Sequence, residues 1–329
     1  MPTNDAVTFP AKGTAVVEPV PDSDPGPEEI VVETTRTLIS SGTELALLTD
    51  QAQYTSLPVE RPGYSHVGEV VEVGTDVSQE LIGTRVGTAG SHRKYVTVPQ
   101  ESAISIPDGV SDEAGTFHSL AAVTMNGLRR GRVVWGERVG IFGLGLIGQL
   151  TGRFAHVAGA TPTVGLEIAD FRRGFFPERP GMASVDTTPT DYSEDVEAET
   201  GGHPFDVVIE ATGNAAVVPE EFDHLRDEGR FVLLSSPRTI GEFDYYRDCH
   251  RPGYEIIGAH ARTHASVQTP KTPWTRRAHQ ELFFALLSAG RVEVESMITH
   301  RFQLTEAPSA YDMLLEDRTQ ALGVILTYD

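Results

Sequence analysis

The chain contains a single cysteine, Cys249, so it can form neither an internal disulfide nor a zinc site built from several cysteines. No apolar run approaches the roughly 18 residues that are needed to cross a bilayer. The first residues also lack the charged-then-apolar pattern of a signal peptide. We therefore expect a cytoplasmic protein that does not insert into a membrane.

Lysine is scarce as well, because only three of the 26 basic residues are lysine, and the formal net charge is −21. Such a surface repels nucleic acid and anionic lipid, so we expect neither as a partner. A lysine-poor acidic surface also fits a halophile-like protein that is kept soluble in concentrated salt. There, repulsion between charges is screened within about 3 Å at 1 M.

The 329 residues suffice for two domains, each with its own core. Up to about residue 120 the chain consists of short strand-like runs separated by turn residues. Strand-like and helix-like segments then alternate, which predicts an α/β domain with a parallel, doubly wound sheet. Its candidate strands are Val139–Phe142, Thr163–Glu167, Asp206–Glu210, Arg230–Leu234 and Glu255–Gly258. A helix at Arg276–Ser288, a second around Ala307–Leu315 and a closing strand at Ala321–Leu326 complete the chain.

The strongest chemical signal is a glycine-rich turn, GLGLIG, that directly follows the strand Val139–Phe142. In this context the first glycine permits a tight turn, and the second lets a pyrophosphate approach the backbone. The third lets the next helix pack against the strand. Free N–H groups at the start of that helix then bind phosphate. We predict that a dinucleotide contacts Gly143, Leu144, Gly145, Leu146, Ile147 and Gly148.

The same motif predicts an acidic residue about 20 positions further on, and Glu167 stands there at the end of the second strand. A carboxylate at this position accepts hydrogen bonds from the ribose hydroxyls and repels a 2′-phosphate, so Glu167 favours NAD over NADP. Arg172 and Arg173 are contrary evidence, because arginines turned toward the ribose could bind that phosphate.

The chain resembles the medium-chain dehydrogenase/reductase superfamily, which includes zinc alcohol and polyol dehydrogenases and zinc-free quinone reductases. The resemblance covers nearly all of the chain and follows landmarks in the right order. They are ISSGTEL, PGYSHVGEVVEVG, GLGLIG, DVVIEATGN and the C-terminal stretch that begins ITHRFQL. The resemblance implies a Rossmann NAD-binding domain at residues 125–264. It also implies a chaperonin-10-like (GroES-like) β-barrel domain made from residues 1–124 and 265–329, with the active site where the two domains meet.

The residues that hold catalytic zinc in this superfamily are replaced in this chain. The corresponding positions carry Ser41, Tyr64 and Ser65, whose side chains end in hydroxyl groups. The remaining position carries either the imidazole of His118 or the hydroxyl of Ser119. Hydroxyls are poor zinc ligands, so we expect no metal. A rearranged zinc site made of Glu44, His66 and His118 stays open as an alternative.

Without zinc, hydride transfer still needs a group that polarises the carbonyl and a route for the proton. Thr43 matches the family position that passes the proton from the substrate oxygen. The phenol of Tyr64 could point at the same oxygen, or could instead be a buried group bonded to the backbone. His118 could shuttle the proton, because an imidazole titrates near working pH. With His66, these residues are the catalytic candidates.

The runs DVVIEATGN and FVLLSSP belong to the cofactor side, both by resemblance and because ligands of parallel sheets lie at the carboxyl ends of the strands. The expected neighbours of the nicotinamide half are Ala211, Thr212, Gly213, Ser235 and Ser236. In the superfamily the strand at Glu255–Gly258 commonly pairs across a dimer axis. The resemblance therefore implies a homodimer or a larger homo-oligomer.

The SSGTEL and PGYxxVG variants are similar to a branch that contains bacteriochlorophyllide-type dehydrogenases and sugar- or cyclitol-modifying oxidoreductases. We expect an NAD(H)-dependent oxidoreductase that transfers hydride between nicotinamide and a secondary alcohol or ketone, without catalytic zinc. Its small-molecule substrate would be polyol-, sugar- or cyclitol-like. Three alternatives stay open: a zinc-free quinone or enone reductase, a zinc-dependent dehydrogenase with the rearranged site, and a non-catalytic NAD(H)-binding sensor.

Overall fold

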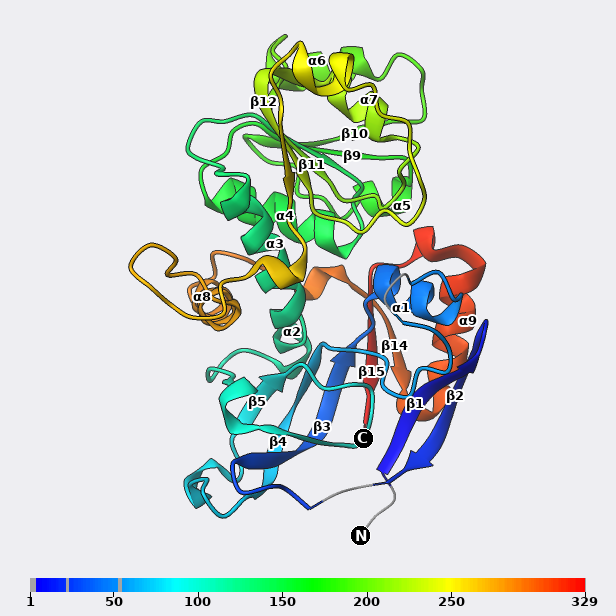
Figure 1. Cartoon of the computed structure of the whole chain (residues 1–329), viewed down its shortest axis with the longest axis vertical. Helices are drawn as coiled ribbons and strands as arrows, with labels where there is room; N and C mark the ends of the chain where they lie inside the picture. Colours follow the sequence, from blue (N-terminus) through cyan, green and yellow to red (C-terminus); the bar gives the residue numbers. More distant parts are fainter. Residues whose placement is uncertain (1–3, 22–23, 53–54, 329) are drawn as a thin grey trace. The chain divides into compact units, whose positions relative to one another are not determined.

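The computed structural model describes residues 4–21, 24–52 and 55–328. It divides into two compact units, which are described separately (Figure 1). The terminal unit consists of Met1–Ser119 and Gln280–Asp329, and the central unit consists of Leu120–His279. None of the helices in the described part of the chain is long and apolar enough to cross a membrane.

The central unit is built on a parallel sheet with the strand order β10-β9-β8-β11-β12-β13. Its strands are β8 (Val139–Phe142), β9 (Thr163–Glu167), β10 (Met182–Asp186), β11 (Phe205–Glu210), β12 (Leu225–Leu233) and β13 (Glu255–Gly258). The order reverses between β8 and β11, and ligands of such sheets bind outside the carboxyl ends of the strands at this point. The predicted doubly wound parallel sheet is confirmed.

The strand β10 was not predicted from the sequence, because its five residues alternate irregularly between buried and half-buried positions and form no apolar run. It extends the sheet beyond β9, and Asp186 at its end pairs in register with Glu167. The helices of the central unit are α3 (His118–Arg130), which begins two residues before the unit does, α4 (Leu146–Val157), α5 (Asp170–Arg173), α6 (Ser193–Thr200) and α7 (Val218–Asp223).

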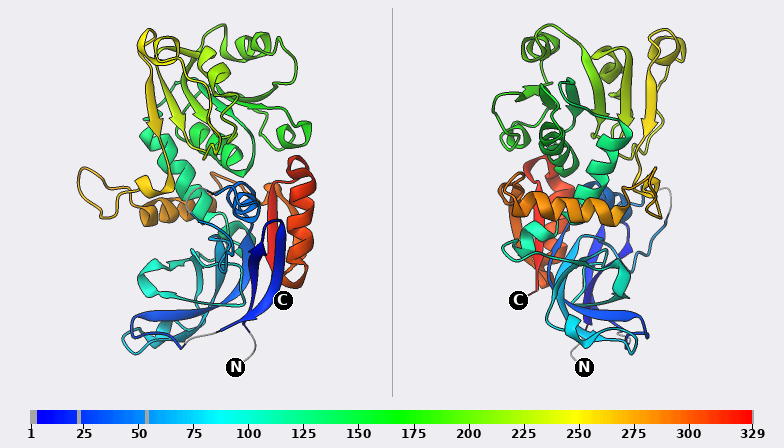
Figure 2. Two further views of the ribbon diagram at one scale, coloured as in Figure 1. Left: turned by 45° about the vertical axis from the view of Figure 1, so that its right-hand side comes forward. Right: turned by 90° about the vertical axis from the view of Figure 1, so that its left-hand side faces the viewer.

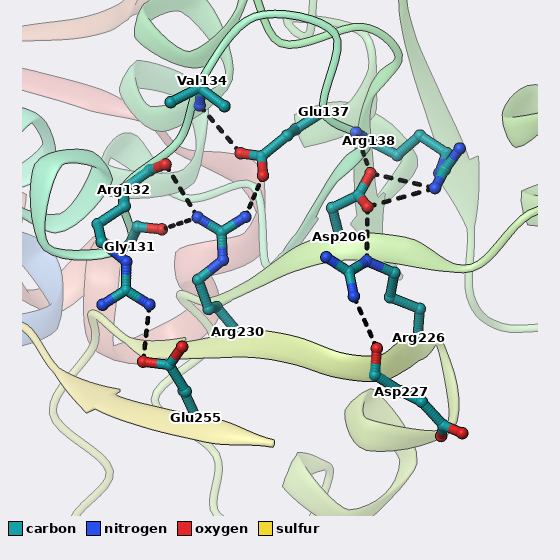
Figure 3. A network of polar contacts seen from close by, with 10 residues as sticks. All are labelled: Gly131, Arg132, Val134, Glu137, Arg138, Asp206, Arg226, Asp227, Arg230 and Glu255. Atoms are coloured by element: carbon teal, nitrogen blue, oxygen red, sulfur yellow. Dashed lines mark hydrogen bonds and ion pairs between the residues drawn. The ribbon is translucent and has the colours of Figure 1, made fainter. Parts of the chain in front are cut away.

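Ion pairs join the segments at the amino ends of these strands (Figure 3). The buried guanidinium of Arg230 in β12 donates to the carbonyl oxygens of Gly131 (2.7 Å) and Arg132 (2.9 Å) and pairs with Glu137. Asp206 in β11 pairs with two further arginines, one before β8 and one in β12. A buried ion pair is costly to break, because one partner is then left uncompensated. This network therefore stabilises the end of the sheet that lies opposite the expected cofactor site.

The terminal unit contains a seven-stranded sheet with the order β14-β15-β3-β4-β5-β7, in which β6 pairs with β3, and a separate β1-β2 hairpin. The hairpin is β1 (Asn4–Ala11) and β2 (Thr14–Val20). The sheet strands are β3 (Glu29–Leu38), β4 (His66–Val73), β5 (Arg85–Thr88), β6 (Tyr95–Pro99), β7 (Ile104–Ser105), β14 (Ile298–Gln303) and β15 (Gly323–Thr327). Because β15 pairs antiparallel with β3, both ends of the chain build one sheet, as the resemblance implied (Figure 2).

A hydrophobic core lies between the hairpin, the strands and two helices of this unit, α1 (Ser41–Leu48) and α9 (Ala307–Asp317). The rings of Phe9 and Tyr311 meet edge to face with their centroids 5.0 Å apart, and both are fully buried. Short α2 (Asp112–Gly115) and α8 (Arg276–Ser288) complete the helices that have a part in this unit. This core fixes the position of α1, which carries the candidate residues Thr43 and Glu44.

Candidate functional site

The glycine turn of the central unit has the geometry that a pyrophosphate-binding turn requires. Gly143 has a φ of +88°, a left-handed conformation that side chains rarely adopt. A Cβ added to Gly148 would lie 1.8 Å from the carbonyl oxygen of Gly143, so only glycine lets α4 pack this closely. A Cβ added to Gly145 would meet nothing within 4 Å. The space beside Gly145 is therefore open for a ligand, while its two partners shape the turn.

Helix α4 begins at Leu146, directly after Gly145. The N–H groups of a first helical turn have no intrahelical acceptor, and the positive end of the helix dipole lies there. A diphosphate placed at this end would receive backbone hydrogen bonds without any cationic side chain. The residues present therefore fit the dinucleotide that the motif implies.

Glu167 lies at the carboxyl end of β9 with its side chain buried and bound to this same turn. Its Oε2 atom accepts a hydrogen bond from the backbone N–H of Leu144 at 2.8 Å, and its Oε1 atom accepts one from Ala169 at 3.1 Å. Nη1 of Arg172 lies 3.8 Å from Oε2. A carboxylate has about four acceptor positions, so Glu167 keeps capacity for ribose hydroxyls.

Glu210, which sequence reasoning did not select, organises the loops on the expected nicotinamide side. Its buried Oε1 atom accepts hydrogen bonds from the backbone N–H (2.7 Å) and hydroxyl (2.6 Å) of Thr212 and from the N–H of Gly213 (2.9 Å). Its Oε2 atom accepts one from the hydroxyl of Ser235. One carboxylate thus joins the loops after β11 and β12. The acid that immediately precedes Ala-Thr-Gly at a strand end was the available signal.

The other predicted residues of this side lie at the same edge of the sheet. Ala211 donates its N–H to the carbonyl oxygen of Phe142 at 2.8 Å. A Cβ on Gly143 would come within 2.9 Å of the Thr212 backbone, so the glycine turn lies directly against the loop after β11. Ser236 follows Ser235 and is exposed. The predicted turn and the loops after β11 and β12 therefore lie next to one another at one edge of the sheet.

A second buried acid, Glu221 in α7, lies near Glu210 and carries a proton. Neither of its carboxyl oxygens has a hydrogen-bond partner among the described residues. Burial, followed by the charges of Glu210 and Glu220, raises the pKa of Glu221 to about 9. Because burial and nearby like charges both disfavour ionisation, Glu221 stays neutral at neutral pH.

In the terminal unit, Tyr64 forms a cluster of hydroxyl groups with two residues at the start of α1. Its phenol oxygen lies 2.6 Å from Oγ of Ser40 and 3.5 Å from Oγ1 of Thr43. The hydroxyl of Ser119 donates to the carbonyl oxygen of Tyr64 at 2.7 Å, which fixes the backbone of this residue. Thr43 and Tyr64 were both catalytic candidates. Ser40 was not selected, and only its contact with Tyr64 brings it into the cluster.

His66 lies in β4, fully buried between two threonines. Its Nε2 atom lies 2.8 Å from the hydroxyl of Thr34, and its Nδ1 atom lies 2.9 Å from that of Thr88. Burial, then the charges of His118 and His92, lower its pKa to about 3. A ring whose two nitrogens are both engaged and which stays neutral does not support the catalytic role considered for His66.

Glu44, in the first turn of α1, is buried in a polar cluster of its own. Its Oε2 atom accepts from the hydroxyl of Tyr311 (2.5 Å) and lies 2.9 Å from Nε2 of His92, and its Oε1 atom accepts from the N–H of Ser40 (2.7 Å). Burial alone would raise the pKa of Glu44. The charge and hydrogen bond of His92, with hydrogen bonds from Tyr311 and Ser40, lower it instead. Glu44 therefore holds the backbone of Ser40 in place.

His118 begins α3 with its ring buried. Its Nδ1 atom lies 2.7 Å from the amide nitrogen of Gln280, and its ring stacks on Phe284 with centroids 6.3 Å apart. Because an amide nitrogen only donates, Nδ1 accepts, and the neutral ring carries its proton on Nε2. The three residues of the alternative zinc site, Glu44, His66 and His118, each contact different partners. Among the described residues, no group of three or more His, Cys, Asp or Glu side chains could hold a metal ion.

Comparison with known proteins identifies a matching family model and several relatives. Residues 147–269 match the family model of zinc-binding dehydrogenases. The chain is 24% identical over 353 residues to the sorbitol dehydrogenase of Halalkalibacterium halodurans, with 96% of each chain covered. It is 26% identical over 330 residues to the L-threonine 3-dehydrogenase of a Marinomonas species, covering 90% of this chain and 91% of the relative. A D-guloside 3-dehydrogenase of Shigella flexneri is 24% identical over 249 residues, or 74% of this chain and 71% of the relative.

Solved structures share the fold over the whole chain. An Escherichia coli oxidoreductase/dehydrogenase of unknown specificity has a TM-score of 0.86 at 17% identity, with 99% of both chains covered. A candidate zinc-binding dehydrogenase from Sinorhizobium meliloti, bound to NADP, has a TM-score of 0.81 at 24% identity, covering 99% of this chain and 100% of that one. An Escherichia coli alcohol dehydrogenase complexed with NADH has a TM-score of 0.83 at 17% identity and 99% coverage of both. These two structural relatives therefore bind different cofactors.

Proposed function

We propose that this chain, a member of the medium-chain dehydrogenase superfamily, is an NAD(H)-dependent enzyme that interconverts a secondary alcohol and a ketone. The observation that carries the cofactor choice is Glu167, whose carboxylate is bound to the pyrophosphate turn through Leu144. The reaction class is supported by the family match and by relatives that are named as sorbitol, threonine and guloside dehydrogenases. Those names favour a polyol- or sugar-like substrate.

The central unit supplies the residues that bind the cofactor. The backbone of Gly145 and the start of α4 would hold the diphosphate, and Glu167 would accept hydrogen bonds from the ribose hydroxyls. When bound, the nicotinamide supplies the hydride acceptor or donor. Glu210 holds Thr212, Gly213 and the Ser235 loop in one arrangement, which would orient the nicotinamide half.

We further propose that the hydroxyl cluster of the terminal unit takes the place of zinc. Ser40, Thr43 and Tyr64 can donate a hydrogen bond to the oxygen that develops negative charge, and can relay its proton. The positions of the family's zinc ligands offer hydroxyls at Ser41 and Ser65, which are weak zinc ligands. In this scheme the chain itself polarises the substrate carbonyl.

The proposed enzyme is a homodimer or larger homo-oligomer. Strand β13 forms one edge of the parallel sheet, and Ile256 in this strand is 44% exposed. An edge strand has unpaired backbone groups that can pair with the same strand of a second copy. Light scattering coupled to size-exclusion chromatography should give at least twice the mass of one chain, and Ile256→Lys should reduce it. A monomeric wild-type protein would contradict this part of the proposal.

Three measurements on the purified protein test the function. Fluorescence titration should detect NADH binding that is tighter than NADPH binding, and metal analysis should find less than stoichiometric zinc. A turnover screen of polyols, sugars and quinones, with Thr43→Ala as the control, should then yield a polyol or sugar that reduces NAD. Turnover of quinones alone would favour a quinone reductase. Binding without any turnover would favour a sensor, and stoichiometric zinc would overturn the metal-free scheme.

A further inference from the structure

Arg173, one of the two arginines that follow Glu167 and could bind a 2′-phosphate, is held by several groups of the central unit. Its Nη1 atom donates to the carbonyl oxygens of Glu167 (2.9 Å) and Ile168 (3.1 Å), at the end of β9. Its Nη2 atom lies 3.2 Å from Asp170 and 3.0 Å from Asp186. The guanidinium therefore lies against the backbone at the end of β9, and the side chain of Arg173 is only 14% exposed.

Asp186 uses its two carboxylate oxygens for different tasks. Oδ1 accepts hydrogen bonds from the N–H (2.9 Å) and hydroxyl (2.8 Å) of Thr188, which fix the orientation of the carboxylate. Oδ2 is thereby aimed at Nη2 of Arg173, 3.0 Å away. The hydrogen bonds from Thr188 have the largest effect and lower the pKa of Asp186; burial opposes them, and the charge and hydrogen bond of Arg173 lower the pKa further. The pairing is consequently present at neutral pH.

The position of this ion pair is set by the sheet. Asp186 ends β10 in register with Glu167 at the end of β9, so the pair lies beside the carboxylate that selects the ribose. Asp170 also contacts Arg173, but its side chain is 99% exposed and its charge is screened by water. Asp186 is 37% exposed and is the better-ordered partner.

We propose that Asp186 is a specificity-determining residue that keeps Arg173 from serving as a 2′-phosphate site and so supports discrimination against NADP. The inference rests on the proposed use of NAD. An arginine near the ribose can bind the 2′-phosphate through its planar fork of donors. While Asp186 pairs with the guanidinium of Arg173, it neutralises the positive charge and occupies donors that could otherwise bind a 2′-phosphate. Glu167 repels the phosphate from one side, and Asp186 removes the group that would attract it.

The test compares the dissociation constants for NADH and NADPH of the full chain by fluorescence titration. Asp186→Asn should tighten NADPH binding about threefold to tenfold and change NADH binding by less than about twofold. Adding Arg173→Met to this variant should abolish the gain, because the gain depends on the released guanidinium. Asp170→Asn is the matched control, because it removes an equal charge from the same guanidinium at an exposed position, and it should change neither constant.

The outcomes separate this inference from the proposed function. If the wild-type chain binds neither cofactor, the proposed function fails and the inference with it. If NADH binds preferentially but Asp186→Asn leaves the NADPH constant unchanged, only the inference is overturned. A gain that persists without Arg173, or an equal gain in Asp170→Asn, would also overturn it. Asp186→Ser provides a second variant with the same expectation, should Asp186→Asn unfold at a lower temperature than the wild type.

Discussion

The Oε2 atom of Glu167 accepts a hydrogen bond from the backbone N–H of Leu144 at 2.8 Å. This contact joins the acid that we propose selects the ribose to the turn that we propose binds the diphosphate, although the two residues are 23 positions apart. In the proposed complex, two parts of one cofactor would therefore be recognised by a connected structure. A change in the acid is expected to alter both the choice of cofactor and the turn.

Glu167→Gln should weaken NADH binding about tenfold, because a neutral amide accepts weaker hydrogen bonds than a carboxylate. NADPH binding should weaken less or improve, since the repulsion of the 2′-phosphate is lost. Titration of both cofactors measures the ratio of their dissociation constants. An unchanged ratio would mean that Glu167 does not face the ribose.

Two glycine substitutions in the turn should affect different properties, one the cofactor affinity and the other the melting temperature. Gly145→Ala should fold with an unchanged melting temperature but lose cofactor affinity by about tenfold or more, because its methyl group would fill the open space in which we propose that the diphosphate binds. Gly148→Ala should lower the melting temperature, because its Cβ would lie 1.8 Å from a backbone oxygen. Thermal unfolding and NADH titration, both performed on each variant, separate the two roles. Full NADH affinity in Gly145→Ala would argue against a ligand at this position.

Removing the hydroxyls of the terminal unit should lower turnover without unfolding the protein. Thr43→Ala and Tyr64→Phe are each expected to reduce kcat about a hundredfold, the usual contribution of a positioned proton donor. Ser40→Ala should reduce it less, since Ser40 acts on Tyr64 rather than at the end of the cluster. The affinity for NADH should stay unchanged in all three. Activity retained in Tyr64→Phe would remove this residue from the mechanism.

Stability should depend on pH through Glu221. Its pKa of about 9 lies above the ordinary value of 4.5, so between these values the unfolded chain loses a proton that the folded chain keeps. The folded state binds more protons, and its stability therefore falls as the pH rises through this window. Glu221→Gln removes that cost and should stabilise the protein at pH 8 by on the order of 2 kcal/mol.

The gain from Glu221→Gln should shrink toward pH 5, because the cost accumulates as the pH rises above the unfolded-state pKa and is still small just above that value. Glu199→Gln, a change of an exposed acid in α6, serves as the control and should show no such trend. Chemical denaturation at pH 5 and pH 8 provides the measurement. A stabilisation that is equal at both values would contradict the shifted pKa.

Local sequence patterns were sufficient for most of the parallel sheet. The apolar runs at Val139–Phe142 and Thr163–Glu167 became β8 and β9 without change, and GLGLIG lies between β8 and α4 as expected. These features depend on neighbours along the chain, such as the period of apolar residues and the freedom of glycine. The strand β10 was missed because its half-buried residues carry no such period.

What the sequence determined by itself was the class of the protein: alternating strands and helices, a dinucleotide turn and an acid about 20 residues beyond it. Only the tertiary structure decided what each polar side chain does. Ser40 joins Tyr64, Glu210 joins two loops, His66 lies between threonines, and Asp186 holds Arg173. These roles depend on side chains that meet from distant segments, and the free energy of a buried polar group depends on the partners that it finds there.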